Sequence, residues 1–208
     1  MSGPGLFISF EGIDGSGKST QARLLAEYLR GQGRDVVLTR EPGGSAGAEE
    51  IRRLVLEGDK DRWSPETELL LFTAARRDHL ERVIAPALAA GQVVICDRFA
   101  DSTRMYQGLG RADLRGLVDQ LHALMIGREP DVTVLIDIAP DLGLGRALSR
   151  GSGEARFESF GVDLQVRMRA GFLALAEEFA WRFVVIDGGR EVAAVAGDVA
   201  RVVEARLP

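Results

Sequence analysis

Residues 12–19 read Gly12-Ile13-Asp14-Gly15-Ser16-Gly17-Lys18-Ser19 and fit the pattern G-x-x-x-x-G-K-[ST], which is typical of a loop that binds nucleotide phosphates. A chain of this composition would match the pattern about 0.002 times by chance. The stretch lies between an apolar run, 6–10, that predicts a buried strand, and a helical pattern over 18–30. Glycines in this setting let backbone N–H groups surround phosphate oxygens, and the helix N-terminus adds its dipole. The sequence therefore predicts a phosphate-binding loop rather than an ordinary turn with a surface lysine.

Apolar runs and helical patterns alternate along the rest of the chain. Further strands are predicted at 36–39, 93–97, 132–137 and 183–187. Further helices are predicted at about 47–57, 66–90, 113–127, 141–150 and 164–179, with a final helix that reaches about residue 206. Nearly continuous apolar strands separated by helices indicate a parallel sheet covered on both faces. We therefore expect residues 1–208 to form a single α/β domain of the P-loop NTPase type, with a five-stranded parallel sheet, helices on both faces and a small lid at about 150–160.

The expected sheet also predicts where a ligand binds. Open parallel sheets bind their ligands beyond the carboxyl ends of the strands. Four residues lie at or just after such an end: Gly12, Glu41, Asp97 and Asp187. We expect the site to be built from the turns that these residues begin.

Composition excludes several classes of function. The chain has 26 basic and 31 acidic residues and a net charge of -5, and dense phosphate contacts need a surplus of basic charge, so no nucleic-acid partner is expected. One cysteine, Cys96, and two histidines, His79 and His122, leave little material for a disulfide framework or a zinc centre. No run approaches the ~18 apolar residues of a membrane span, and no targeting segment is visible, so we expect a cytoplasmic protein with no membrane partner.

The phosphate loop alone leaves the class open among GTPases, motor ATPases and small-molecule kinases. The GTPases read their base with an N-K-x-D motif, which this chain cannot contain because its two lysines, Lys18 and Lys60, lie elsewhere. Motor ATPases normally need a longer chain. The length of 208 residues fits the small kinases.

Four blocks of sequence narrow the class further. They are Glu11-Gly12-Ile13-Asp14-Gly15, Thr39-Arg40-Glu41-Pro42-Gly43-Gly44, Leu71-Phe72-Thr73-Ala74-Ala75-Arg76 and Asp97-Arg98-Phe99-Ala100-Asp101-Ser102-Thr103. With Met105-Tyr106-Gln107-Gly108 after the last block, the chain resembles the thymidylate kinases in their bacterial form, from Leu6 to about Asp187. The resemblance implies transfer of the γ-phosphoryl group of ATP to dTMP to give dTDP, with Mg²⁺ as cofactor and usually in a homodimer.

The resemblance also implies roles on the donor side. The ATP-binding residues would be those of the loop and the first turn after it: Gly12, Ile13, Asp14, Gly15, Ser16, Gly17, Lys18, Ser19 and Thr20. Lys18 would be catalytic because it reaches the β- and γ-phosphates, and Ser19 and Asp97 would hold Mg²⁺.

On the acceptor side, the resemblance places dTMP against residues from three blocks. Phe72 would stack on the thymine ring and Arg76, one helical turn later on the same face, would hydrogen-bond the base. Arg98 would be catalytic and hold the acceptor phosphate, since a guanidinium matches phosphate in a bidentate manner. The remaining dTMP contacts would come from Asp14 to the sugar 3′-hydroxyl, Arg52 to the phosphate, Thr103 and Gln107 over the base, and Glu41 in the pocket wall.

A further arginine is expected from the lid. Some thymidylate kinases carry an arginine directly after the loop aspartate, where this chain has Gly15. Family members without it use the lid, in which Arg150 and Arg156 are the catalytic candidates here. Arg146 would flank the adenine of ATP.

Two other functions remain open at this point. One is a kinase for another nucleoside monophosphate, and the other is a P-loop module that binds nucleotide without transferring phosphate. The second would lack an acceptor site, whereas Phe72, Arg76 and Arg98 predict one.

Overall fold

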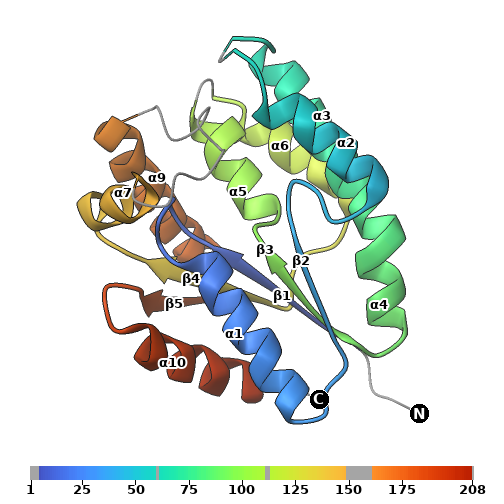
Figure 1. The fold of residues 1–208 in the computed structure, drawn as a ribbon. Helices are drawn as coiled ribbons and strands as arrows, with labels where there is room; N and C mark the ends of the chain where they lie inside the picture. Colours follow the sequence, from blue (N-terminus) through green and yellow to red (C-terminus); the bar gives the residue numbers. More distant parts are fainter. Residues whose placement is uncertain (1–4, 60, 111–112, 149–160, 208) are drawn as a thin grey trace.

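A computed structural model describes residues 5–59, 61–110, 113–148 and 161–207 (Figure 1). Its strands are β1 (Leu6–Glu11), β2 (Val36–Arg40), β3 (Val93–Asp97), β4 (Val132–Asp137) and β5 (Phe183–Asp187). They form one sheet in the order β2-β3-β1-β4-β5, and every neighbouring pair is parallel. The predicted α/β class with its five-stranded parallel sheet is confirmed.

The helical segments surround this sheet. They are α1 (Lys18–Gly31), α2 (Ala46–Leu56), α3 (Pro65–His79), η1 (Leu80–Ile84), α4 (Ala85–Ala89), α5 (Ala100–Met105), η2 (Tyr106–Gly110), α6 (Arg115–Leu121), η3 (His122–Ile126), α7 (Pro140–Leu148), α9 (Gly161–Glu178) and α10 (Val192–Glu204). None of the helices within the described ranges is long and apolar enough to cross a membrane.

Two details of the helices differ from the sequence expectations. The helix expected at 66–90 is continuous, but its middle turn, η1, is π-helical. The helical segment over 100–110, formed by α5 and η2, was not predicted, because its polar and glycine-rich sequence lacks a clear apolar stripe. The predicted lid at 150–160 lies outside the described residues.

Both faces of the sheet are covered. Along β1, Leu6, Ile8 and Phe10 pack into one core cluster with α1 and α10, whereas Phe7 packs into another with η1 and α4. This alternation is the period of two that a strand imposes on its side chains. A third cluster lies between β4 and α9. Figure 1 shows α1 and α10 on one side of the sheet and α5 and α9 on the other, so both faces are covered, as the sequence predicted.

The parallel register brings the strand ends to one edge. Phe10 lies opposite Asp97 across the β1–β3 pair. Backbone hydrogen bonds continue just beyond the strands. Arg98 N donates to Phe10 O at 2.9 Å, and Glu41 N donates to Asp97 O at 3.0 Å. The turns after β1, β2 and β3 therefore meet at the same place.

A buried ion pair fixes α5 to the sheet. Arg182, directly before β5, is fully buried and donates from both Nη atoms to Asp101 of α5, at 2.6 and 2.8 Å. It also donates to Thr133 Oγ1 of β4 at 2.7 Å. Arg104 and Glu129 extend the network.

Breaking this pair tests its contribution to stability. Arg182→Met leaves the Asp101 carboxylate buried with one arginine partner fewer, and we expect the free energy of unfolding to fall by about 3–5 kcal/mol. Urea denaturation measures the change. Arg201→Met, at an exposed pair with Asp198, is the matched control and should change stability by less than about 0.5 kcal/mol. Equal effects in both variants would contradict the assignment.

Candidate active site

The phosphate loop connects β1 to α1 with a backbone that only glycine tolerates at key positions. Gly15 has φ of 76° and Gly17, the N-cap of α1, has φ of 98°. A Cβ at Gly15 would lie 1.9 Å from Gly143 O of α7, so any side chain there would collide with backbone. Gly17 has no side chain that could occupy the first N–H groups of α1, which leaves these donors to an anion.

Lys18 is folded against the loop. Its side chain is buried, and Nζ donates to Ile13 O at 2.8 Å. Burial and the neighbouring Arg98 lower the pKa of Lys18 to about 8. A bound polyphosphate would add negative charge beside Nζ and so stabilise the charged form of Lys18 further.

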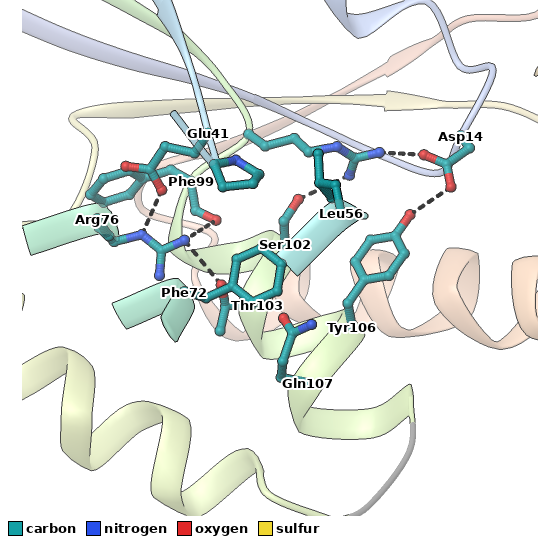
Figure 2. A pocket seen from close by; sticks show the side chains of 12 residues that line it. Asp14, Glu41, Leu56, Phe72, Arg76, Phe99, Ser102, Thr103, Tyr106 and Gln107 are labelled. Carbon is teal, nitrogen blue, oxygen red and sulfur yellow. Dashed lines mark hydrogen bonds and ion pairs between the residues drawn. The ribbon is translucent and has the colours of Figure 1, made fainter. Parts of the chain in front are cut away.

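A pocket opens beside the loop. Figure 2 shows Arg76 and Glu41 at one end, Asp14 and Tyr106 at the other, and Phe72 between them. The lining residues come from the turns after β1, β2 and β3 and from α2, α3, α5 and η2: Asp14, Glu41, Pro42, Leu56, Phe72, Arg76, Arg98, Phe99, Ser102, Thr103, Tyr106 and Gln107.

At the α3 end, Arg76 is held before any ligand binds. Its Nε donates to Glu41 Oε2 at 2.7 Å, and Nη2 donates to Thr103 Oγ1 at 3.0 Å and Phe99 O at 3.2 Å. Glu41 Oε1 in turn pairs with His79 Nδ1 at 3.0 Å, and His79 Nε2 contacts Thr39 Oγ1 at 2.8 Å. Both oxygens of the buried Glu41 are therefore bonded within the protein, and Glu41 holds the Arg76 guanidinium in the pocket wall.

At the loop end, Arg98 pairs with Asp14. Arg98 Nη2 donates to Asp14 Oδ1, and Tyr106 Oη donates to Asp14 Oδ2 at 3.1 Å. Burial alone would raise the pKa of Asp14, but Arg98 and Lys18 outweigh it, and the pKa is lowered. Burial and Asp14 raise the pKa of Tyr106, so its hydroxyl stays a donor. This end of the pocket thus presents a cation and a carboxylate directly beside the phosphate loop.

The structure brings together most of the residues expected from sequence. All the expected dTMP-binding residues line the pocket except Arg52, which donates to the backbone O of the lining residue Pro42 at 2.6 Å. Arg146 of α7 donates to Gly188 O at 3.1 Å, near the loop, while Arg150 and Arg156 lie outside the described residues. Sequence reasoning missed Pro42, Leu56, Phe99, Ser102 and Tyr106. Their places within the quoted blocks were the available signal for all but Leu56.

A divalent cation has suitable ligands near the loop. Asp97 Oδ1, at the end of β3, is buried and has no hydrogen-bond partner among the described residues, as expected of an oxygen that awaits a ligand. The Ser19 hydroxyl lies exposed at the start of α1. Hydroxyl and carboxylate oxygens suit Mg²⁺.

A second group of potential ligands does not fit a metal. Ligand atoms of Glu41, His79 and Cys96 lie within 4.8 Å of one another. Both Glu41 oxygens are already paired, with Arg76 and His79. Burial holds the pKa of the Cys96 thiol well above its usual range, and the thiol donates to Arg98 O at 3.0 Å. The group is a hydrogen-bond network.

A phosphate loop beside a pocket with two arginines and a buried aromatic ring defines the class of P-loop nucleoside monophosphate kinases. Comparison with known proteins narrows this class. A family model described as "Thymidylate kinase" matches residues 10–199. A thymidylate kinase from Ruegeria pomeroyi is 74% identical over 207 residues, covering 100% of this chain and 98% of the relative. A second one, from Dinoroseobacter shibae, is 71% identical and covers 96% of each chain.

A solved structure agrees. The crystal structure of thymidylate kinase from Ehrlichia chaffeensis matches with a TM-score of 0.78 and 38% identity, covering 97% of this chain and 99% of the other. The chain belongs to the thymidylate kinase family, whose members are ATP-dependent phosphotransferases that convert dTMP to dTDP. The predicted family is confirmed, and the findings support neither a kinase for another monophosphate nor a non-catalytic module.

The network around Arg76 generates a test. Arg76→Ala removes a donor fixed in the pocket wall, and we expect the KM for dTMP to rise about tenfold or more while the KM for ATP stays within about twofold. Steady-state kinetics with each substrate varied in turn measures both. The matched control is Arg77→Ala on the same helix, where Arg77 is exposed and pairs with Glu81, and this variant should behave like the unchanged protein. A rise in the KM for ATP alone would show that the pocket is not the acceptor site.

Proposed function

We propose that this chain transfers the γ-phosphoryl group of ATP, bound at 12–20, to dTMP bound in the pocket, and so forms dTDP. The observation that carries the proposal is the contact between Arg98 and Asp14, because it joins the acceptor pocket to the phosphate loop. Phosphoryl transfer needs two polyanions aligned and positive charge on the transferred group rather than a strong general base. Both substrates would meet here beside Arg98 and Lys18.

The pocket residues divide into two sets. For the base, Phe72 stacks on the thymine, Arg76 and Gln107 donate hydrogen bonds, and Thr103 and Glu41 keep Arg76 in place. For the sugar and phosphate, Asp14 accepts from the 3′-hydroxyl and Arg98 binds the phosphate. Arg52, through its bond to Pro42 O, shapes the wall of the pocket or reaches the phosphate after a side-chain movement.

The donor side uses the loop and its surroundings. Backbone N–H groups of the loop hold the β- and γ-phosphates, and Lys18 follows the charge during transfer. Ser19 and Asp97 would hold Mg²⁺, which neutralises phosphate charge when bound. Arg146 would lie against the adenine, since its bond to Gly188 O keeps it at the nucleotide edge of the sheet.

The wider context of the chain is also inferred. We infer that the chain, 1–208, is a single domain, because every strand within the described residues, from Leu6 to Asp187, joins one sheet. A homodimer is favoured by exposed apolar side chains on α3, α6 and η3, namely Leu70, Leu117, Leu124 and Met125. Of these segments, α3 and η3 are neighbours, since Arg77 Nη1 donates to Met125 O at 2.8 Å. The need for ATP and dTMP favours the cytoplasm.

An acceptor panel tests the function directly. ATP consumption is measured with dTMP, dUMP, dCMP, dGMP and AMP, and we expect dTMP to be preferred. Lys18→Met removes a preorganised cation, so turnover with dTMP should fall at least about a hundredfold with the fold intact. Arg23→Met, at an exposed position on α1, is the control and should leave turnover unchanged. A preference for a purine monophosphate, or normal turnover of Lys18→Met, would contradict the proposal.

The lid arginines form a separate prediction. Because Gly15 offers only backbone N–H, the transferred group needs a further cation, which we assign to Arg150 first and Arg156 second. Arg150→Ala should lower kcat by more than about tenfold with a modest change in dTMP affinity. Arg167→Ala, exposed on α9, serves as control. The assignment is wrong if both lid variants keep more than about half of the original kcat, well short of one tenfold step.

A further inference from the structure

Glu11 is the last residue of β1 and directly precedes the phosphate loop, yet its side chain turns toward the connection between β3 and α5. It is fully buried. Its Oε1 accepts from Phe99 N at 2.8 Å and from Ser102 N at 3.3 Å, and its Oε2 accepts from Ser102 Oγ at 2.6 Å. One carboxylate thus joins the strand before the donor loop to the turn that carries Arg98.

That turn needs support from outside. Arg98 has φ of 69° and is the one non-glycine residue with positive φ in the described ranges. Such a conformation persists only where the surroundings hold it. The next residue, Phe99, is the N-cap of α5 and its side chain cannot accept the N–H groups of the first turn. Glu11 accepts two of them and so acts as a cap supplied by another strand.

The carboxylate also reaches the Arg98 guanidinium through Ser102. Arg98 Nη1 donates to Ser102 Oγ at 3.0 Å, and the Ser102 hydroxyl donates to Glu11 Oε2. An ionised carboxylate only accepts and a guanidinium only donates. The Ser102 hydroxyl between them therefore accepts from Arg98 and donates to Glu11. Arg98 Nη1 also approaches Gly12 O at 3.4 Å. The guanidinium is therefore held at Nη1 by Ser102, which Glu11 of β1 anchors, and by Gly12 O of the loop, while Nη2 faces Asp14.

We propose that Glu11 is a positioning residue for the acceptor phosphate: it holds the 98–102 turn and, through the Ser102 hydroxyl, aims the Arg98 guanidinium into the pocket. This inference rests on the proposed role of Arg98. Glu11 itself does not line the pocket. Burial and Asp101 raise the pKa of Glu11 to about 7, while Ser102, Arg98 and Phe99 N–H favour its charged form. The groups that stabilise this charge are thus the same groups that Glu11 positions.

The test replaces the carboxylate by an amide of the same shape. In Glu11→Gln, the amide NH₂ must face either the Ser102 hydroxyl proton or the Phe99 N–H, so one buried donor loses its acceptor in either orientation. We expect kcat/KM for dTMP to fall about tenfold or more, with the KM for ATP within about twofold. A crystal structure of the variant should show the Arg98 guanidinium displaced from Asp14.

Two further variants separate positioning from general stability. Glu129→Gln alters a partly buried carboxylate that pairs with Arg104 of α5, and neither residue lines the pocket. It should lower the melting temperature and leave the kinetics with dTMP unchanged. Ser102→Ala keeps Glu11 and removes only the hydroxyl, so kcat/KM for dTMP should fall by about threefold. Its combination with Glu11→Gln should lose less than the product of the two single effects.

The outcomes distinguish this inference from the proposed function. The positioning role is overturned if Glu11→Gln matches Glu129→Gln in its dTMP kinetics, or if it raises the KM values for ATP and dTMP equally. An Arg98→Ala variant is measured alongside. If Arg98→Ala impairs dTMP use and Glu11→Gln does not, only the positioning role fails. If Arg98→Ala leaves dTMP use unchanged, the proposed acceptor site fails, and the role of Glu11 fails with it.

Discussion

The parallel pairing of β1 with β3 sets Phe10 opposite Asp97, and Arg98 N then donates to Phe10 O at 2.9 Å. Because of this register, the loop that begins at Gly12 and the turn that begins at Arg98 leave the sheet side by side. A slip of one residue would invert every side chain of β1 and turn the core residues Leu6, Ile8 and Phe10 away from α1. The burial of these residues therefore also fixes the distance between the two halves of the site.

Charges at the site are paired before any substrate arrives. Arg98 has Asp14, and Arg76 has Glu41. A chain with a net charge of -5 can still bind two anions here, because the guanidinium groups are already positioned and desolvated before binding. The cost of ordering these long side chains falls on folding rather than on binding. The Arg182–Asp101 pair is also ordered on folding. It fixes α5, the helix that carries Ser102 and Thr103.

The sheet, the phosphate loop and the order of strands and helices were predictable because they follow from apolar periodicity and a specific glycine pattern. The shared pocket of Phe72, Arg76 and Arg98 was predictable because the sequence blocks that contain them are specific in combination. Other features were not predictable. The helical segment over 100–110 has no apolar stripe, and the buried Arg182 resembles any surface arginine until it is placed against Asp101 of α5. Arg52 lies on the helix after the second block, and no sequence pattern indicated that its side chain would donate to Pro42 O.

The close approach of Gly15 to Gly143 limits how this enzyme can change. A Cβ at Gly15 would lie 1.9 Å from Gly143 O, and a Cβ at Gly143 would lie 2.8 Å from Asp14 O. The loop and the first turn of α7 are thus in contact through two glycines, with no room for a side chain from either. An arginine at position 15, as in some relatives, is inaccessible by a single substitution, since α7 would have to retreat at the same time. Evolution from this sequence to the loop-arginine type would therefore require coordinated changes in two segments more than a hundred residues apart in the chain.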